Sequence, residues 1–144
     1  MSRKTSDIAY TTRDLAAFGG FCWVISHGKD WDKWEYGFFV LLTKSKPVEY
    51  RYSIPERGTE TRAALGASKD DPIRAFCHTH PKSDTSGNLD FGGDDKDLYK
   101  KAVKTFPSIA FYLMNQFDEV RLAQSEQDFL PGRRLDFKSS SCPK

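Results

Sequence analysis

The chain has 144 residues, of which 29% are charged, 38% hydrophobic and 14% aromatic, and its formal net charge at pH 7 is +2. This is the composition of an ordinary folded domain and not of a disordered chain, and the length corresponds to one domain. The small net charge does not indicate binding to nucleic acid or to a membrane surface, so we expect neither partner.

The cysteines and the N-terminal segment indicate the cellular location of the protein. Cys22, Cys77 and Cys142 are sparse and odd in number, so they do not suggest a disulfide framework and favour a reducing environment. Residues 1–20 lack the apolar core of a signal peptide. No stretch reaches the ~20 apolar residues that span a bilayer. We therefore expect a cytoplasmic protein, or a domain exported without a cleaved signal peptide.

Hydrophobic periodicity predicts two helices. The first covers residues 5–28, where apolar residues recur at spacings near three, four and seven and where Ser6 or Asp7 could cap the start. The second covers residues 94–106 and carries an apolar stripe of Leu98, Ala102 and Val103.

Five short segments read as strands because they are dense in aromatic and aliphatic residues or alternate with a period of two. These segments are residues 35–44, 48–54, 73–80, 108–115 and 119–124. Two loops separate them, at 55–72, with a short helical turn around 61–65, and at 81–93.

This order predicts a single α/β (α+β) domain over residues 1–144: a sandwich with a mixed β-sheet flanked by helices, and not a run of βαβ units. The tail at 138–144 is expected to be loose. Exposed edges of such a small sheet are compatible with a homodimer.

His78 and His80 lie one residue apart at the end of the third strand, so their imidazoles point to the same side. Two imidazoles are half of a tetrahedral zinc site, and a catalytic site usually adds one protein ligand and a water. Asp95 is our choice for that ligand, because a carboxylate in the first turn of the second helix faces the positive end of the helix dipole. Asp94 competes with it, because helix boundaries read from a sequence shift by a few residues.

A zinc hydrolase also needs a carboxylate that is near the metal but not bound to it, to take a proton from water. Glu35 meets this requirement at the start of the first strand, although it could be a plain strand-edge charge. Trp31 and Trp34 in the loop before it are candidates to line a substrate groove.

These motifs resemble the JAMM/MPN (Jab) metallopeptidase family, whose pattern is a glutamate on an early strand, then H-x-H-P, then S-x-x-D. Here "EYG" contains Glu35, "HTHP" contains His78 and His80, and "FGGDD" contains Asp95. The resemblance runs over residues 7–124. The "HTHP" and "EYG" motifs are similar to those of uncharacterised bacterial Jab-like domains, some of which are thought to be toxin or effector modules.

The resemblance implies an MPN/cytidine-deaminase-like fold with one zinc ion (Zn2+) per chain. His78, His80 and Asp95 would be the ligands, and Glu35 would be the general base and later the acid toward the leaving amine. The implied reaction is hydrolysis of a peptide, isopeptide or related amide bond in a protein or peptide substrate.

The chain departs from the family pattern in two ways. Gly92 stands where the family has the serine that steadies the tetrahedral oxyanion, and losing one such donor can cost ~10²–10³ in rate. Ser83, Ser86 or a backbone N–H of the Gly92–Gly93 turn could substitute for it. The spacer between His80 and Asp95 is also longer than in the best-known members.

These departures keep two further interpretations open. One is a catalytically weak or inactive MPN-like module that binds a metal or a protein partner. The other is an adaptor or antitoxin-like domain whose histidines are incidental, which predicts no metal at all.

Overall fold

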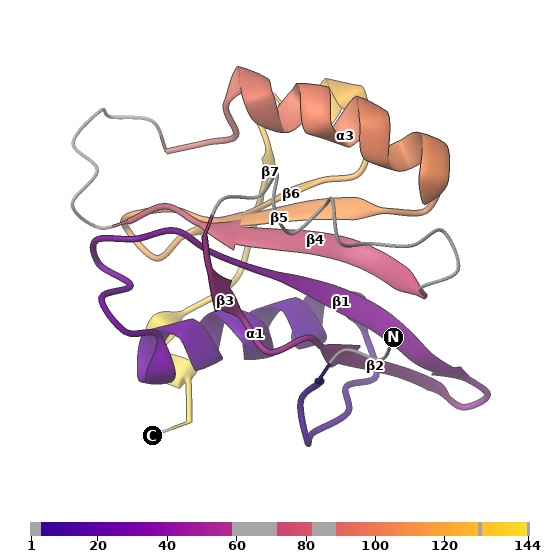
Figure 1. Ribbon diagram of the computed structural model, residues 1–144, viewed down its shortest axis with the longest axis horizontal. Helices are drawn as coiled ribbons and strands as arrows, with labels where there is room; N and C mark the ends of the chain where they lie inside the picture. The colour runs from indigo at the N-terminus through magenta and orange to yellow at the C-terminus, as the bar shows by residue number, and fades with distance from the viewer. Residues whose placement is uncertain (1–3, 59–71, 82–88, 130, 144) are drawn as a thin grey trace.

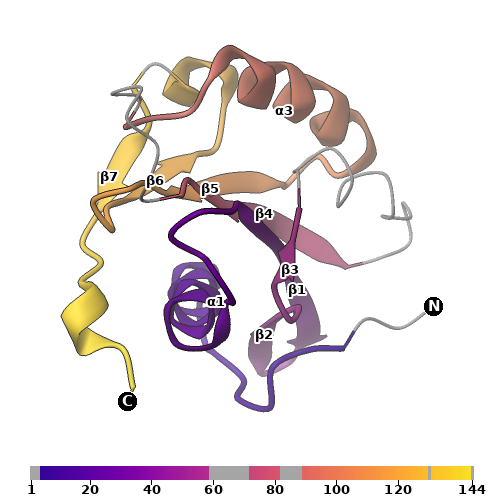
Figure 2. The ribbon, with the colours of Figure 1, turned by 60° about the vertical axis from the view of Figure 1, so that its left-hand side comes forward.

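The computed structural model describes residues 4–58, 72–81, 89–129 and 131–143. Within these residues a seven-stranded sheet lies between helix α1 (Arg13–His27) and helix α3 (Gly93–Thr105), as Figures 1 and 2 show. The strands are β1 (Tyr36–Ser45), β2 (Val48–Tyr52), β3 (Glu56–Arg57), β4 (Ile73–Thr79), β5 (Ala110–Met114), β6 (Val120–Ala123) and β7 (Arg133–Leu135). No helix of the described part is both long and apolar enough to cross a membrane.

The sheet has the order β2-β1-β4-β5-β6-β7, with β3 paired to the start of β1. Among the described pairings, β4 and β5 run parallel and the others run antiparallel. The predicted α+β sandwich with a mixed sheet flanked by helices is therefore confirmed.

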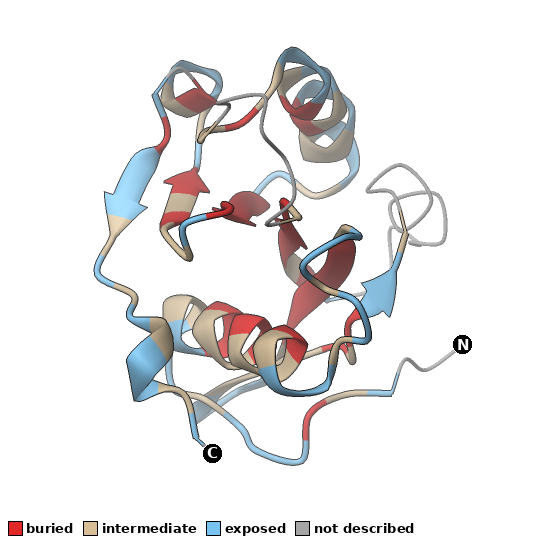
Figure 3. Cartoon of the chain, turned by 90° about the vertical axis from the view of Figure 1, so that its left-hand side faces the viewer, coloured by how far each residue is buried: buried red, intermediate tan, exposed pale blue. Residues whose placement is uncertain are grey.

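Strand alternation divides the core into two layers. Phe38 and Val40 of β1 pack toward α1, whereas Phe39 and Leu41 pack toward α3. β5 is buried at every position because both of its faces are covered, which explains its unbroken apolar run. Figure 3 shows the buried residues concentrated on the strands between the two helices.

Helix α1 is shorter than predicted, and its cap is Thr12, whose hydroxyl accepts a hydrogen bond from the Leu15 N–H at 3.1 Å. The residues before it do not continue the helix. They run along β2 instead, where the Tyr10 N–H donates to the Tyr50 carbonyl and the Ser6 N–H donates to the Tyr52 carbonyl, both at 2.8 Å. Tertiary pairing has overridden the local helical pattern in this segment.

The glycine pair inside α1 has a packing role. A Cβ on Gly20 would lie 2.2 Å from the Phe38 ring, and one on Gly19 would lie 2.3 Å from the Tyr10 hydroxyl. The missing side chains therefore let the helix lie directly on the aromatic residues beneath it.

Two short strands were not predicted. β3 has two residues and β7 has three, and the exposed Arg133 and Arg134 of β7 gave no apolar signal. Such short strands are defined by their partners β1 and β6 and not by their own composition. The turn expected around 61–65 lies outside the described residues.

The expectation that the cysteines form no disulfide is wrong, because Cys22 and Cys142 are bonded across 120 residues of sequence. The bond ties Cys142 of the tail to α1. A 3-10 turn, η2 (Ser139–Ser141), precedes the bond, and the Phe137 ring packs 5.2 Å from the Phe18 ring of α1. A pairing at this separation depends on the path of the chain and cannot be deduced from cysteine spacing. Cys77 is a buried free thiol.

We expect loss of this disulfide to lower the free energy of unfolding by about 2–5 kcal/mol, because the bond restricts a very long loop of the unfolded chain. Urea unfolding of the oxidised wild type and of Cys142→Ser measures the difference. The control is a reducing agent, which should lower the midpoint of the wild type and leave that of Cys142→Ser unchanged. Equal midpoints for the oxidised wild type and Cys142→Ser would contradict the bond.

Candidate metal centre

The sheet topology brings the termini of three strands to the same end of the sheet. β4 and β5 are parallel and end together, and the antiparallel β1 begins beside the end of β4. Helix α3 begins above the same end of the sheet, on the left in Figure 1. The ends of strands and the beginning of a helix therefore meet at one place, where side chains from distant parts of the sequence can converge.

His78 lies on the face of β4 that packs toward α3, and only 1% of its surface is exposed. Its ring stacks on Phe76 at 6.0 Å and lies 6.2 Å from the Phe91 ring. Burial lowers the pKa of His78 to about 4, although the nearby Asp95 carboxylate opposes the shift. The imidazole is therefore neutral at pH 7, which is the form that binds metals.

His80 follows on the same face, just beyond the end of β4. Its backbone N–H donates to the Met114 carbonyl at 2.9 Å and so extends the pairing with β5. Its Nδ1 atom is buried and has no hydrogen-bond partner within the described part of the chain. A buried ring nitrogen in this state requires an explanation, and a bound ion would supply one.

Asp95 lies in the first turn of α3 and is 3% exposed. One carboxylate oxygen, Oδ2, accepts a hydrogen bond from the Gly92 N–H at 2.6 Å, while Oδ1 lies 3.6 Å from His78 Nε2. The hydrogen bond and the helix dipole both stabilise the ionised form in this orientation. Asp94, the competing candidate, is exposed to solvent.

His78, His80 and Asp95 form a group whose ligand atoms all lie within 4.8 Å of one another. Two imidazoles and one carboxylate could hold a divalent ion, and this donor set suits zinc and other first-row metals. Three protein ligands leave a fourth tetrahedral position for water or substrate, as catalytic zinc sites require.

Glu35 is half-buried and immediately precedes β1. Gly37 pairs with His78, and the Tyr36 N–H donates to the Thr79 hydroxyl at 3.0 Å. Since residues two apart share a face, Glu35 lies on the same side of the sheet as His78, beside the end of β4. The glycine at 37 places no side chain between them.

The other predicted residues are distributed differently. Trp31 packs against the core on the α1 side, whereas Trp34 is 52% exposed and lies under the Arg57 guanidinium, 5.2 Å from its ring centre. Gly92 is the N-cap of α3. Ser83 and Ser86 lie outside the described residues. The third histidine, His27, ends α1 and stacks on Trp23.

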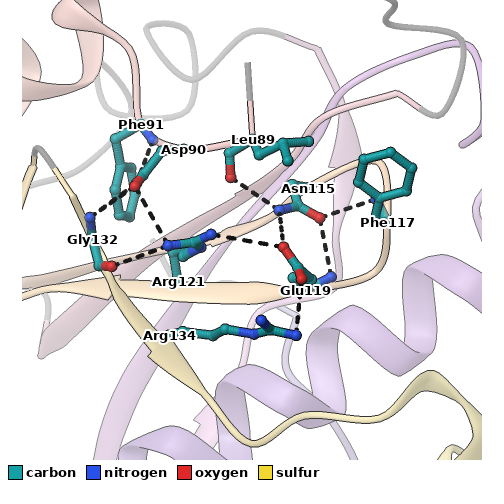
Figure 4. Close-up of polar contacts among 9 residues, drawn as sticks. All are labelled: Leu89, Asp90, Phe91, Asn115, Phe117, Glu119, Arg121, Gly132 and Arg134. Atoms are coloured by element: carbon teal, nitrogen blue, oxygen red, sulfur yellow. Dashed lines mark hydrogen bonds and ion pairs between the residues drawn. The ribbon is translucent and has the colours of Figure 1, made fainter. Parts of the chain in front are cut away.

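A group of polar residues beside the centre was not singled out from the sequence. Asp90 accepts hydrogen bonds from the Phe91 and Gly132 N–H groups and lies close to Arg121, as Figure 4 shows. Asn115 is fully buried next to them. Their sequence positions carry no motif, so only the fold reveals the group.

No protein-family model matches this chain, and no curated protein is similar enough to count as a match.

We expect the purified chain to bind about one zinc ion, and His80→Ala and Asp95→Asn to lose it. Elemental analysis after dialysis checks the content. Binding should also raise the wild type's free energy of unfolding by about 4 kcal/mol at a free zinc concentration 1,000 times the Kd.

Asp94→Asn is the matched control for Asp95→Asn, because it removes the same charge from the same helix turn at an exposed position. Loss of zinc from Asp94→Asn with retention in Asp95→Asn would reverse the assignment of the ligand.

Proposed function

We propose that this chain is a metal-dependent hydrolase of the JAMM/MPN type that cleaves a peptide, isopeptide or related amide bond. In this proposal His78, His80 and Asp95 hold one zinc ion, and Glu35 is the general base. The observation that carries the proposal is the convergence of three buried ligand groups within 4.8 Å. The order of the four residues along the chain, which resembles that family, supports the choice of reaction.

The proposed mechanism assigns one role to each side chain. A bound zinc ion would supply Lewis acidity, which lowers the pKa of water to about 7 and polarises a carbonyl. Glu35 takes the proton of the attacking water and returns it to the leaving amine nitrogen, so that the amide and water give an acid and an amine. His78, His80 and Asp95 stay as ligands throughout.

An oxyanion formed during hydrolysis needs a hydrogen-bond donor beside it. Gly92 has no hydroxyl, and its backbone N–H already donates to Asp95 Oδ2. The sequence had allowed a backbone N–H of the Gly92–Gly93 turn to replace the family serine. The Gly92 N–H does not do so, because it is already bonded to Asp95. This observation favours the alternative function, a catalytically weak or inactive metal- or protein-binding module.

The disulfide bears on the compartment. A bond between Cys22 and Cys142 persists in oxidising surroundings and is rare in the cytosol. The bond therefore favours an exported location over the cytoplasm, which agrees with a toxin or effector role.

We expect Glu35→Gln to reduce turnover by about 10²–10⁴-fold and to leave zinc content unchanged, because the amide cannot take a proton. A screen of fluorogenic peptide and isopeptide-linked lysine substrates measures turnover. The control is Glu56→Gln, an exposed carboxylate on β3 beside the start of β1, which should retain activity. Normal turnover in Glu35→Gln would remove the proposed base.

We expect Gly92→Ser to raise turnover at least several-fold, because it adds a hydroxyl donor at the oxyanion position, where one donor is worth ~10²–10³ in rate. Gly92 has φ −89° and ψ 174°, which serine adopts readily. Gly93→Ser is the control one residue further on. If neither the wild type nor Gly92→Ser hydrolyses any substrate while both bind zinc, the binding-module function is the correct one.

A further inference from the structure

A cluster of polar side chains joins three segments beside the metal centre: the segment 89–91 that leads into α3, the turn between β5 and β6, and the residues just before β7 (Figure 4). Each segment comes from a different part of the chain. The contacts between them tie the residues before α3 to the sheet.

Asp90 is at the middle of this cluster. Its Oδ1 accepts hydrogen bonds from the Phe91 N–H at 2.8 Å and from the Gly132 N–H at 3.1 Å. Its Oδ2 lies 2.9 Å from the same Gly132 nitrogen and 3.6 Å from Arg121 Nη1. One carboxylate thus ties the entry of α3 to the sheet and to the residues before β7, and a cation balances its charge.

Asn115 holds the other side of the segment. It is fully buried, and its side-chain amide donates to the Leu89 carbonyl at 2.9 Å and to Glu119 Oε1 at 3.0 Å. Its Oδ1 accepts from the Phe117 and Glu119 N–H groups, at 3.0 and 3.1 Å. The segment is therefore bonded to the β5–β6 turn through Leu89, and to β6 and the residues before β7 through Asp90.

Gly132 is required for this fit. A Cβ there would lie 2.8 Å from Asp90 Oδ1 and 2.9 Å from the Phe91 ring. Any larger residue must push the carboxylate or the ring away. By contrast, a Cβ on Gly93, the first residue of α3, would meet nothing within 4 Å.

The segment so held touches two of the three candidate ligands. The Phe91 ring lies against the His78 ring, and the Gly92 N–H fixes Asp95 Oδ2, which leaves Oδ1 toward His78. A shift of residues 89–92 would therefore move the carboxylate that faces His78. Metal ligands tolerate such shifts poorly, because their geometry must be held closely.

We propose that Asp90 is a positioning residue for the metal centre, acting through the Phe91–Gly92 backbone on Asp95, with Asn115, Arg121 and Gly132 as its supports. This inference rests on the proposed function, because it requires that the three ligands bind a metal. It adds a residue that touches neither the metal nor the substrate.

The test is zinc and cobalt titration of the full-length oxidised chain, with competition against a chromophoric chelator and with the visible absorption of bound cobalt as the geometric readout. Asp90→Asn and Gly132→Ala are the test variants. Asp94→Asn and Gly93→Ala are their matched controls, since they make the same changes at exposed positions in the first turn of α3. Urea unfolding of each metal-free variant separates affinity from stability.

We expect the Kd for zinc to rise about 10–100-fold in Asp90→Asn and Gly132→Ala, the usual range for groups that orient a ligand. The cobalt spectrum should change in both, while the controls keep the wild-type Kd and spectrum. If Asp90→Asn does not fold, Gly132→Ala and Arg121→Gln provide the same comparison.

Wild-type Kd and spectrum in folded Asp90→Asn and Gly132→Ala would overturn the positioning role and leave the metal centre intact. A lower unfolding free energy with an unchanged Kd would likewise reduce Asp90 to a structural residue. Absence of metal binding by the wild type would overturn the proposed function itself, and the positioning role with it.

Discussion

Burial of two imidazoles and a carboxylate at the end of β4 is the constraint on which the rest of this structure depends. Polar groups removed from water are costly unless they are paired or ligated. His78, His80 and Asp95 are each less than a tenth exposed and lie close together. The domain can accept this arrangement because α3 places a helix N-terminus above them and because the neutral form of His78 avoids a buried positive charge.

The surrounding fold holds the end of β4 in place. β4 lies between β1 and β5, so the histidine strand is bonded on both sides. On one face α1 packs through its glycine pair, and the Cys22–Cys142 bond ties the C-terminal tail to that helix. On the other face, Asp90 and Asn115 bond the segment that leads into α3 to the sheet. A rigid scaffold of this kind is what a site with demanding geometry needs.

The chemistry open to the site follows from what it has and what it lacks. It has three ligands of the types that zinc prefers and a glutamate on the same side of the sheet. It lacks a hydroxyl at Gly92, the position that corresponds to the oxyanion-stabilising serine of the family pattern that the motifs resemble. The three buried ligand groups therefore support the proposed metal site, whereas the missing hydroxyl favours the catalytically weak alternative.

The sequence by itself determined the features that depend on local pattern. Short runs that are dense in aromatic and aliphatic residues, or that alternate with a period of two, located the principal strands, and the mixed α+β sandwich followed from their order. The spacing of His78 and His80 placed both on one side of a strand, because residues two apart share a face. Helix electrostatics favoured a carboxylate in the first turn of the second helix, which left both Asp94 and Asp95 open. The structure buries Asp95 and exposes Asp94, which agrees with the choice of Asp95.

Only the tertiary structure decided the features that join distant segments. The Cys22–Cys142 bond, the pairing of residues 5–10 with β2, and strands β3 and β7 all depend on partners far away in sequence. The same is true of Asp90, whose carboxylate meets Gly132 and Arg121 through the fold alone. Local propensity cannot encode such contacts, because each contact forms only when the path of the chain brings its two partners close together.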